Sequence, residues 1–235
     1  MEESNGWCPE TSWTRIIAIR DEKEQTALNT ALEELCEIYR PAALAAFRMK
    51  HGFSPEDAED ASQDFLVWLI QSELIHRADR KKGKFRSYFL TCLDNFALNR
   101  RRKLNREKGG SKAIHLPTDS DIDIDIPVEN NPEDHIHMAW AQALLRNVRS
   151  TLEFEEIADG REEEWKIIKN FLSIQSNITI EEAAKKLSIS TKSLSTKIHR
   201  LRKRFSSLLK RHVSSLVSSE LEFNEELNFL REIFA

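Results

Sequence analysis

The sequence predicts an all-α protein with two helical domains joined by an acidic linker, the second domain carrying a helix-turn-helix. Three observations support this prediction. Nearly every periodic stretch repeats its apolar residues at helical spacing. Glycine and proline number only six each among 235 residues, and 31% of the residues are charged, a balance that favours helices over sheets. The basic residues gather in two blocks, with an acidic stretch between them.

The net charge of -4 conceals this segregation. Residues 80–112 contain twelve Lys and Arg against two Asp and Glu, and residues 183–219 contain ten Lys and Arg and no acid. Between the blocks, residues 119–134 carry seven acids, and no Lys or Arg stands between Lys112 and Arg146. Two basic blocks of this kind predict two separate contacts with polyanions.

The composition also excludes several classes of protein. No apolar run approaches the ~20 residues of a membrane span, and the acidic start MEESNGWCPETSW lacks the features of a signal peptide. We therefore expect a cytoplasmic protein without a membrane span. Three cysteines, distant from one another and odd in number, argue against a disulfide framework. No metal-ligand spacing, glycine-rich phosphate loop or Ser/His/acid set occurs, which predicts no enzyme, no metal and no cofactor.

The spacing predicts three helices in the first half of the chain. The first covers residues 27–49. The second begins in GFSPED, where Ser54 can cap the helix and Pro55 suits its first position, and it runs to about Glu73. The third covers residues 85–103 and carries aromatic residues along one face. The segment HRADRKKGK between the last two is predicted to be a basic loop.

The second half begins with residues 111–134, which are predicted to be an extended linker because dense acids and prolines disfavour a packed strand. Helices resume near Ile136. A last amphipathic helix covers residues 221–234, with Leu221, Leu227, Leu230 and Ile233 as its apolar residues. We expect this helix to pack on the second domain, because amphipathic helices usually cover a core.

The stretch TIEEAAKKLSISTKSLSTKIHRLRKRF has helix-turn-helix form. Thr179 and Glu182 fit a capping box for the first helix, and Ser190 can cap the second. The turn more usually holds glycine where Ser188 stands. The apolar residues of the second helix step by four, three, four and three, which places them on one narrow stripe: Leu194, Ile198, Leu201, Phe205 and Leu208.

The opposite face of that helix carries side chains that can reach phosphates and base edges in a DNA major groove. They are Thr191, Lys192, Ser195, Thr196, His199, Arg200 and Lys203. Cationic side chains with no acids among them repel one another unless they bind a polyanion. This face therefore predicts a DNA contact. A solvated surface helix is the plainer alternative.

The first basic block joins an aromatic helix to a cationic end. Its phenylalanines are expected in the core, whereas Tyr88 and the cluster 100–102 are better placed to contact unpaired bases and a single-strand backbone. The helix before it carries a polar face that suits a protein partner: Glu56, Asp60, Gln63 and Asp64.

Together these features resemble the extracytoplasmic-function (ECF) group of bacterial RNA polymerase sigma factors. DAEDASQDF is similar to the family's region 2.2, which implies docking on the polymerase clamp helices through Asp60, Gln63 and Asp64, with Glu56 on the same face. CLDNFALNRRR is similar to the segment that reads and melts the minus-ten element, although Asp94 stands where many relatives have a basic residue. AAKKLSISTKSLSTKIHRLRKRF resembles region 4, which reads the minus-thirty-five element.

The resemblance implies a region 2 domain at 12–112, an acidic linker at 113–135, a region 4 domain at 136–212 and a C-terminal helical extension at 213–235. HRADRKKGK would be the loop that captures a flipped base. The implied minus-ten contacts are Arg80, Lys81, Lys82, Lys84, Arg86, Tyr88, Asn95, Asn99, Arg100, Arg101 and Arg102. The phrases TSWTRI, KGKFRSYFL and EELNFL look like a subgroup common in planctomycetes.

The implied function is promoter recognition, DNA melting and transcription initiation in complex with core RNA polymerase. Promoter DNA is then the second partner, and an anti-sigma factor is a further partner of this family. Two alternatives stay open: a helix-turn-helix transcriptional regulator that works without polymerase, and a sigma-like adaptor that binds polymerase but not DNA. Core-dependent initiation distinguishes the first alternative, and the promoter affinity of core with and without the chain distinguishes the second.

Overall fold

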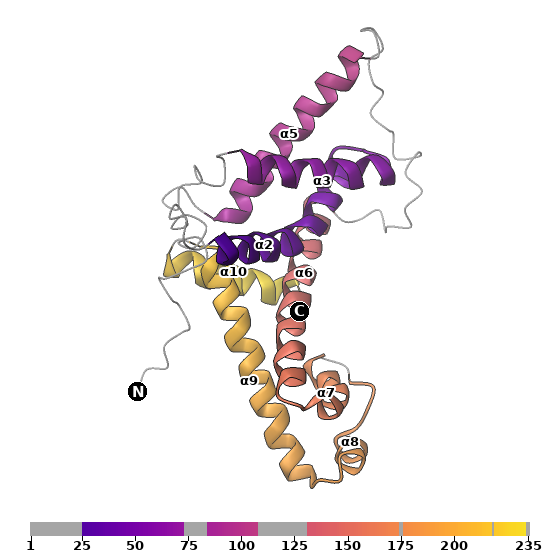
Figure 1. Ribbon diagram of the computed structural model, residues 1–235, viewed down its shortest axis with the longest axis vertical. Helices are drawn as coiled ribbons and strands as arrows, with labels where there is room; N and C mark the ends of the chain where they lie inside the picture. Colours follow the sequence, from indigo (N-terminus) through magenta and orange to yellow (C-terminus); the bar gives the residue numbers. More distant parts are fainter. Residues whose placement is uncertain (1–24, 73–83, 108–130, 174–175, 218, 234–235) are drawn as a thin grey trace. The chain divides into compact units, whose positions relative to one another are not determined.

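The computed structural model describes residues 25–72, 84–107, 131–173, 176–217 and 219–233. All regular structure within these ranges is helical, so the all-α prediction is confirmed for the described part of the chain (Figure 1). The chain divides into two compact units. The first unit combines Cys8–Ala143 with Val213–Ala235, and the second unit is formed by Leu144–His212. The predicted acidic linker and basic loop lie almost wholly outside the described residues.

The first unit is built around three long helices and the C-terminal helix. In it α2 contacts α3, and α3 contacts α5 (Figure 1). Ser54 caps α3 as predicted, because its hydroxyl accepts a hydrogen bond from the Asp57 backbone N–H at 3.1 Å, and Pro55 occupies the first turn. The elements are α2 (Gln25–Ala45), the π-helical turn η2 (Ala46–Lys50), α3 (Pro55–Gln71), α5 (Phe85–Glu107), the start of α6 (Pro132–Ala158) and α10 (Glu220–Ile233).

An aromatic cluster forms the core between η2, α3 and α5. Phe65 of α3 lies at its centre, fully buried. Four aromatic rings surround it, with centroids 5.1 to 6.3 Å away: Phe47, Trp68, Phe89 and Phe96. The predicted core face of α5 is confirmed at four of its five members, since Phe85, Phe89, Cys92 and Leu93 are buried, whereas Phe96 is half-buried.

Asp94 of α5 contacts two nitrogen-bearing side chains, and these contacts explain why an acid stands at this position. It accepts a hydrogen bond from Lys50 Nζ at 2.8 Å and lies 2.9 Å from His51 Nε2. Burial lowers the pKa of His51. The contact with a carboxylate requires Nε2 to carry the proton. Asp94 thereby ties α5 to the end of η2.

The second unit contains the end of α6, α7 (Glu162–Ile168), the 3-10 turn η5 (Lys169–Leu172), α8 (Ile180–Lys186) and most of α9 (Thr191–Ser215). The apolar stripe predicted for α9 is confirmed: four of its five members are buried, and Phe205 packs against them half-buried. The stripe contacts buried residues of the other elements, including Val148, Trp165 and Ala183.

The connection between α8 and α9 has the predicted caps. Thr179 and Glu182 form a capping box at the start of α8. Ser190 accepts a hydrogen bond from the Ser193 backbone N–H at 3.1 Å and so caps α9. Ser188 adopts a positive φ of 54°, in the left-handed region that glycine favours. The chain thus keeps the glycine-type turn geometry with a serine in place.

We expect Ser188→Gly to stabilise the second unit by about 0.5–1 kcal/mol. Glycine removes the steric cost of the left-handed conformation, which exceeds the extra entropy it brings to the unfolded chain. Chemical denaturation of both proteins gives this difference. Since Ser190 caps α9, Ser190→Gly is the control and should instead cost a few tenths of a kcal/mol. A less stable Ser188→Gly protein would contradict the turn geometry.

The C-terminal helix α10 belongs to the first unit. There Phe229 contacts His137 and Trp140 at the start of α6, within the predicted second domain, and Glu226 pairs with Arg86 of α5. Its buried face differs in part from the predicted one. Leu221 is exposed, whereas Phe223 and Glu226 are buried together with Leu230. The apolar pattern identified part of this face, since Leu230 is buried and Leu227 and Ile233 are half-buried, but it missed Phe223 and the buried carboxylate of Glu226.

Two cysteines lie within the described residues, and both are free thiols. Cys36 is half-buried and Cys92 is buried, and burial raises the pKa of each thiol. A raised pKa lowers the thiolate fraction and hence the reactivity of a cysteine. In the same ranges, none of the helices has both the length and the apolar character that crossing a bilayer demands.

Candidate polymerase and nucleic-acid interfaces

The outer face of α3 forms the first candidate interface. Glu56, Asp60 and Gln63 are exposed and recur at a spacing that keeps them on one side of the helix. Val67 continues this line, and its side chain is 51% exposed. We call Glu56, Asp60, Gln63 and Val67 the acidic stripe. The sequence analysis missed Val67, although its position four residues after Gln63 signalled the same face.

Asp64, predicted to dock on polymerase with these residues, lies at the edge of the acidic stripe. It forms an ion pair with Arg100 of α5, a residue predicted to contact DNA. Two residues assigned to different partners therefore bind each other. Within the described residues, Asp60 and Gln63 make no hydrogen bond or ion pair through their side chains.

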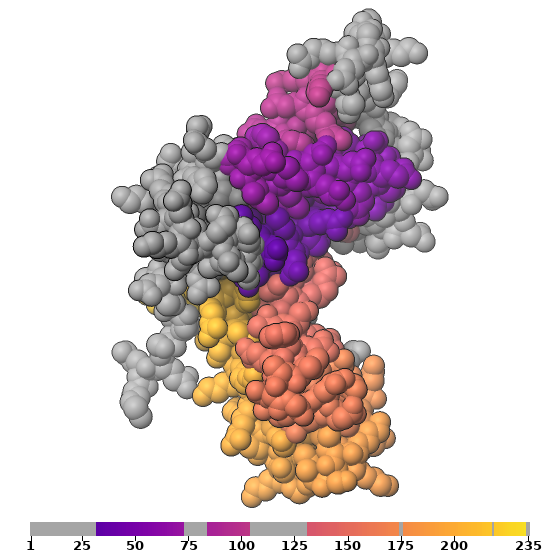
Figure 2. Space-filling model, viewed as in Figure 1, coloured from indigo at the N-terminus to yellow at the C-terminus, as the bar shows by residue number. Residues whose placement is uncertain are grey.

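One side of α5 forms the second candidate interface. Asn95, Asn99 and Arg102 are exposed and Tyr88 is half-buried. Their spacing of seven, four and three residues places them on one side of the helix. We call these four residues the α5 stripe. It combines an aromatic ring, two amides and a cation, which suits unpaired bases and their phosphates. α3 and α5 pack against each other, and their surfaces adjoin in Figure 2.

The remaining minus-ten candidates do not lie on the α5 stripe. Arg80, Lys81 and Lys82 lie outside the described residues, and Arg101 is half-buried on another side of α5. Arg86 stands two residues before Tyr88 and so points to nearly the opposite side of the helix. Its side chain is only 13% exposed. Lys84 and Arg86 are both paired with acids of α10.

The seven candidates on α9 form the third candidate interface, and all of them are exposed. They cover one half of the helix surface, opposite the buried apolar stripe. Ser195 and Thr196 donate their hydroxyl protons to the carbonyl oxygens of Thr191 and Lys192, at 2.9 and 3.0 Å. Their oxygens are left as acceptors on the exposed face. Cations and acceptors together match what a DNA groove offers.

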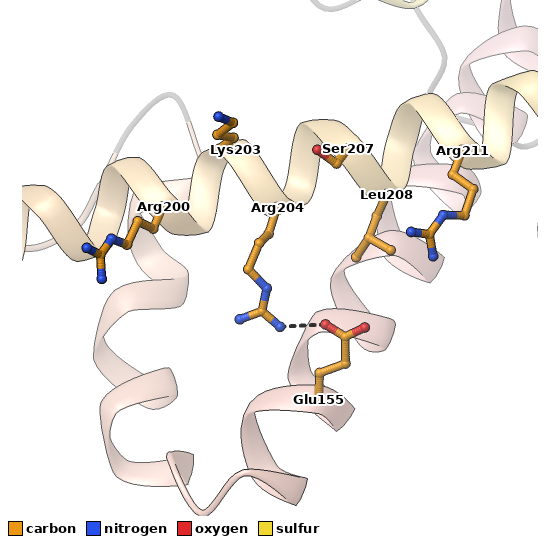
Figure 3. A pocket seen from close by; sticks show the side chains of 7 residues that line it. All are labelled: Glu155, Arg200, Lys203, Arg204, Ser207, Leu208 and Arg211. Atoms are coloured by element: carbon orange, nitrogen blue, oxygen red, sulfur yellow. Dashed lines mark hydrogen bonds and ion pairs between the residues drawn. The ribbon is translucent and has the colours of Figure 1, made fainter. Parts of the chain in front are cut away.

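A largely cationic groove continues this face along α9 (Figure 3). Arg204 crosses the groove and donates to Glu155 of α6 at 2.5 Å. The sequence analysis found the charges but not the groove, because Glu155 comes from a distant part of the chain. The lining residues are Glu155, Arg200, Lys203, Arg204, Ser207, Leu208 and Arg211.

Glu156 fixes the geometry beneath this face. It is 3% exposed and accepts a hydrogen bond from Arg161 Nε at 2.6 Å. A second ion pair joins it to Arg204. The hydrogen bond from Arg161, followed by the charge of Arg204, holds the pKa of Glu156 below its ordinary value of 4.5.

Replacing Glu156 with glutamine removes the charge that pairs with Arg161 and Arg204. The substitution should lower the free energy of unfolding by about 1–2 kcal/mol at neutral pH. The loss is limited to this size because both arginines are partly exposed and solvent screens their charges. The folded-state pKa is depressed, so the carboxylate stabilises the fold above its unfolded pKa. That contribution is lost as the pH falls through the folded-state value. Denaturation curves at pH 7 and below pH 4 test this. A difference that is independent of pH would contradict it.

The comparison with protein families agrees with this geometry. Residues 39–107 match the family model of sigma-70 region 2. The matched segment includes α3 and α5, and so contains both the acidic stripe and the α5 stripe. The match supports a sigma factor function in promoter recognition and RNA polymerase binding. Comparisons with curated proteins and with solved structures gave no match.

Proposed function

We propose that the chain is an ECF-type sigma factor that binds core RNA polymerase and directs promoter recognition, DNA melting and transcription initiation. One observation carries the proposal: the segment that matches sigma-70 region 2 exposes the acidic stripe and, on an adjoining helix, a stripe of two amides, a tyrosine and a cation. The acidic stripe docks on the polymerase. The α5 stripe contacts the minus-ten element.

The second DNA contact is assigned to α8 and α9, as a helix-turn-helix of region 4 type. The capped turn between the helices, the buried apolar stripe and the fully exposed opposite face support this assignment. The domain limits proposed are region 2 at 12–112, an acidic linker at 113–135, region 4 at 136–212 and a C-terminal extension at 213–235. Such a protein catalyses no reaction and works where core polymerase is, in the cytoplasm.

Complex formation tests the proposal. The purified chain and core polymerase from the same source should co-elute in size-exclusion chromatography as a one-to-one complex, and the complex should bind promoter DNA more tightly than core alone. A chain that binds DNA but never core would be a polymerase-independent regulator that uses α9. A chain that binds core without changing its DNA affinity would be an adaptor.

Arg200→Ala and Lys203→Ala should each flatten the salt dependence of binding to the upstream element. Each removes about one phosphate contact, which makes the slope of log K against log salt less negative by roughly 0.9. Lys186→Ala on α8 removes the same charge away from the α9 face and should leave the slope unchanged. Fluorescence anisotropy across a salt series measures all three. Unchanged slopes for both α9 variants would remove these residues from the interface.

A further inference from the structure

The C-terminal helix α10 lies outside the segment that matches sigma-70 region 2, yet it packs on that segment's unit. Its buried face consists of Phe223, Glu226 and Leu230, and Glu226 is 3% exposed. A helix that serves only as a cover gains most from apolar residues along such a face. A carboxylate at its centre points to a more specific contact.

That contact is with Arg86 of α5 and with Lys84, which directly precedes this helix. Glu226 Oε1 lies 3.1 Å from Arg86 Nη2 and 3.6 Å from Lys84 Nζ. Glu225 Oε2 lies 2.9 Å from the same Lys84 nitrogen. Both cations were predicted to contact DNA, and both lie in the segment matched as sigma-70 region 2. Acids of α10 therefore pair with two cations that were predicted to contact DNA.

Aromatic rings complete the site around Arg86. Its guanidinium carbon lies 5.0 Å from the ring centroid of Trp140 and 4.1 Å from that of Phe229. His137 contacts Phe229 edge to face at 5.1 Å. We call Lys84, Arg86, His137 and Trp140 the α10 seat. It combines cations with apolar rings, and so fits a helix that presents acids between aromatic side chains.

α10 does not provide a hydrogen-bond partner for every buried polar group at the α10 seat. Arg86 Nε and Nη1 and Glu226 Oε2 are buried and have no hydrogen-bond partner within the described residues. Buried polar groups normally find partners, and a buried ion pair loses much of its attraction to desolvation. A charged contact of this kind is best suited to specificity or switching. A second anion that satisfied these donors would compete well with Glu226.

We propose that α10 is a replaceable occupant of the α10 seat: it withholds Lys84 and Arg86 from nucleic acid, and promoter DNA displaces it. This inference rests on the proposed sigma factor function. Two features favour exchange. α10 has only 14 residues, a length at which an isolated helix is marginal in water. The Phe85 N–H donates to the Leu216 carbonyl at 3.3 Å, so the segment before α10 stays tethered to α5 and the helix can return.

Hydrogen exchange on the wild-type chain bound to core polymerase tests the displacement. Addition of promoter DNA should speed the exchange of the α10 amides by tenfold or more. Unchanged or slower exchange in α10, measured on a complex that does bind the promoter, would overturn the inference and leave the proposed function standing. A chain that binds neither core nor promoter would overturn the proposed function itself.

A charge-matched pair of variants provides the second readout. Glu226→Gln keeps the shape of the side chain but removes the charge that holds Arg86, whereas Glu232→Gln removes the same charge from an exposed position of α10. In complex with core, Glu226→Gln should bind a single-stranded minus-ten oligonucleotide about three- to tenfold more tightly than wild type. Glu232→Gln should bind like wild type. Equal or weaker binding by Glu226→Gln would mean that α10 is only a structural cover.

Discussion

Replacing Asp60 and Gln63 together with alanine should lower the affinity of the chain for core RNA polymerase by about ten- to hundredfold, or roughly 1.4–2.8 kcal/mol. Both side chains are exposed on the acidic stripe, and neither has a partner within the described residues. The fold should not change, because no packing or internal hydrogen bond is lost. Titration of fluorescently labelled chain with core polymerase measures the affinity, and thermal unfolding checks the fold.

A matched double variant separates docking from a general loss of polarity. Gln142→Ala with Glu232→Ala removes one amide and one acid from exposed positions elsewhere on the first unit. This control should bind core polymerase like wild type. If the Asp60 and Gln63 variant also binds like wild type, the acidic stripe is not the polymerase interface. If the Asp60 and Gln63 variant loses affinity as expected, Val67→Ser offers a finer probe of the same stripe, since exposed apolar residues often lie at the centre of interfaces.

Phe65→Ala should destabilise the first unit by about 3–5 kcal/mol, since it leaves a cavity among four aromatic rings that cannot easily collapse. The ring of Phe65 is fully buried, and its contacts join η2, α3 and α5. Urea denaturation followed by tryptophan fluorescence, to which the neighbouring Trp68 contributes, reports the change.

Phe154→Ala is the control for this cavity. Phe154 is 75% exposed on α6, so the same substitution should change the free energy of unfolding by no more than about 0.5 kcal/mol. Both units contribute to the denaturation curve. The unfolding transition of each variant must therefore be compared with that of the wild type by the same spectroscopic signal. Equal stabilities for the two variants would contradict the aromatic core described for the first unit.

Local features of the fold were predictable from the sequence. Ser54 with Pro55, and Thr179 with Glu182, act over three residues or fewer, so spacing alone identifies them. The apolar stripe of α9 follows from helical geometry. Ser188 shows the limit of this approach: the residue type argued against a glycine-type turn, but the capped helices on either side impose one.

Long-range pairing was not predictable. Arg100 pairs with Asp64 across 36 positions, and Arg86 pairs with Glu226 across 140. A basic residue looks the same in sequence whether it faces solvent or a distant acid, so both arginines were assigned to DNA alone. For α10 the position of Arg86 and Trp140 determines which face is buried, and neither periodicity nor composition contains that information.

The most direct test of a sigma factor function is reconstituted transcription. Purified chain and core RNA polymerase from the same source are combined with a pool of genomic promoter fragments, and initiated transcripts are sequenced. We expect transcripts that depend on the chain and that share two spaced elements upstream of their start sites. Binding of the chain to DNA with no transcripts and no complex with core would contradict the proposal, and the exposed face of α9 would then bind an operator without polymerase.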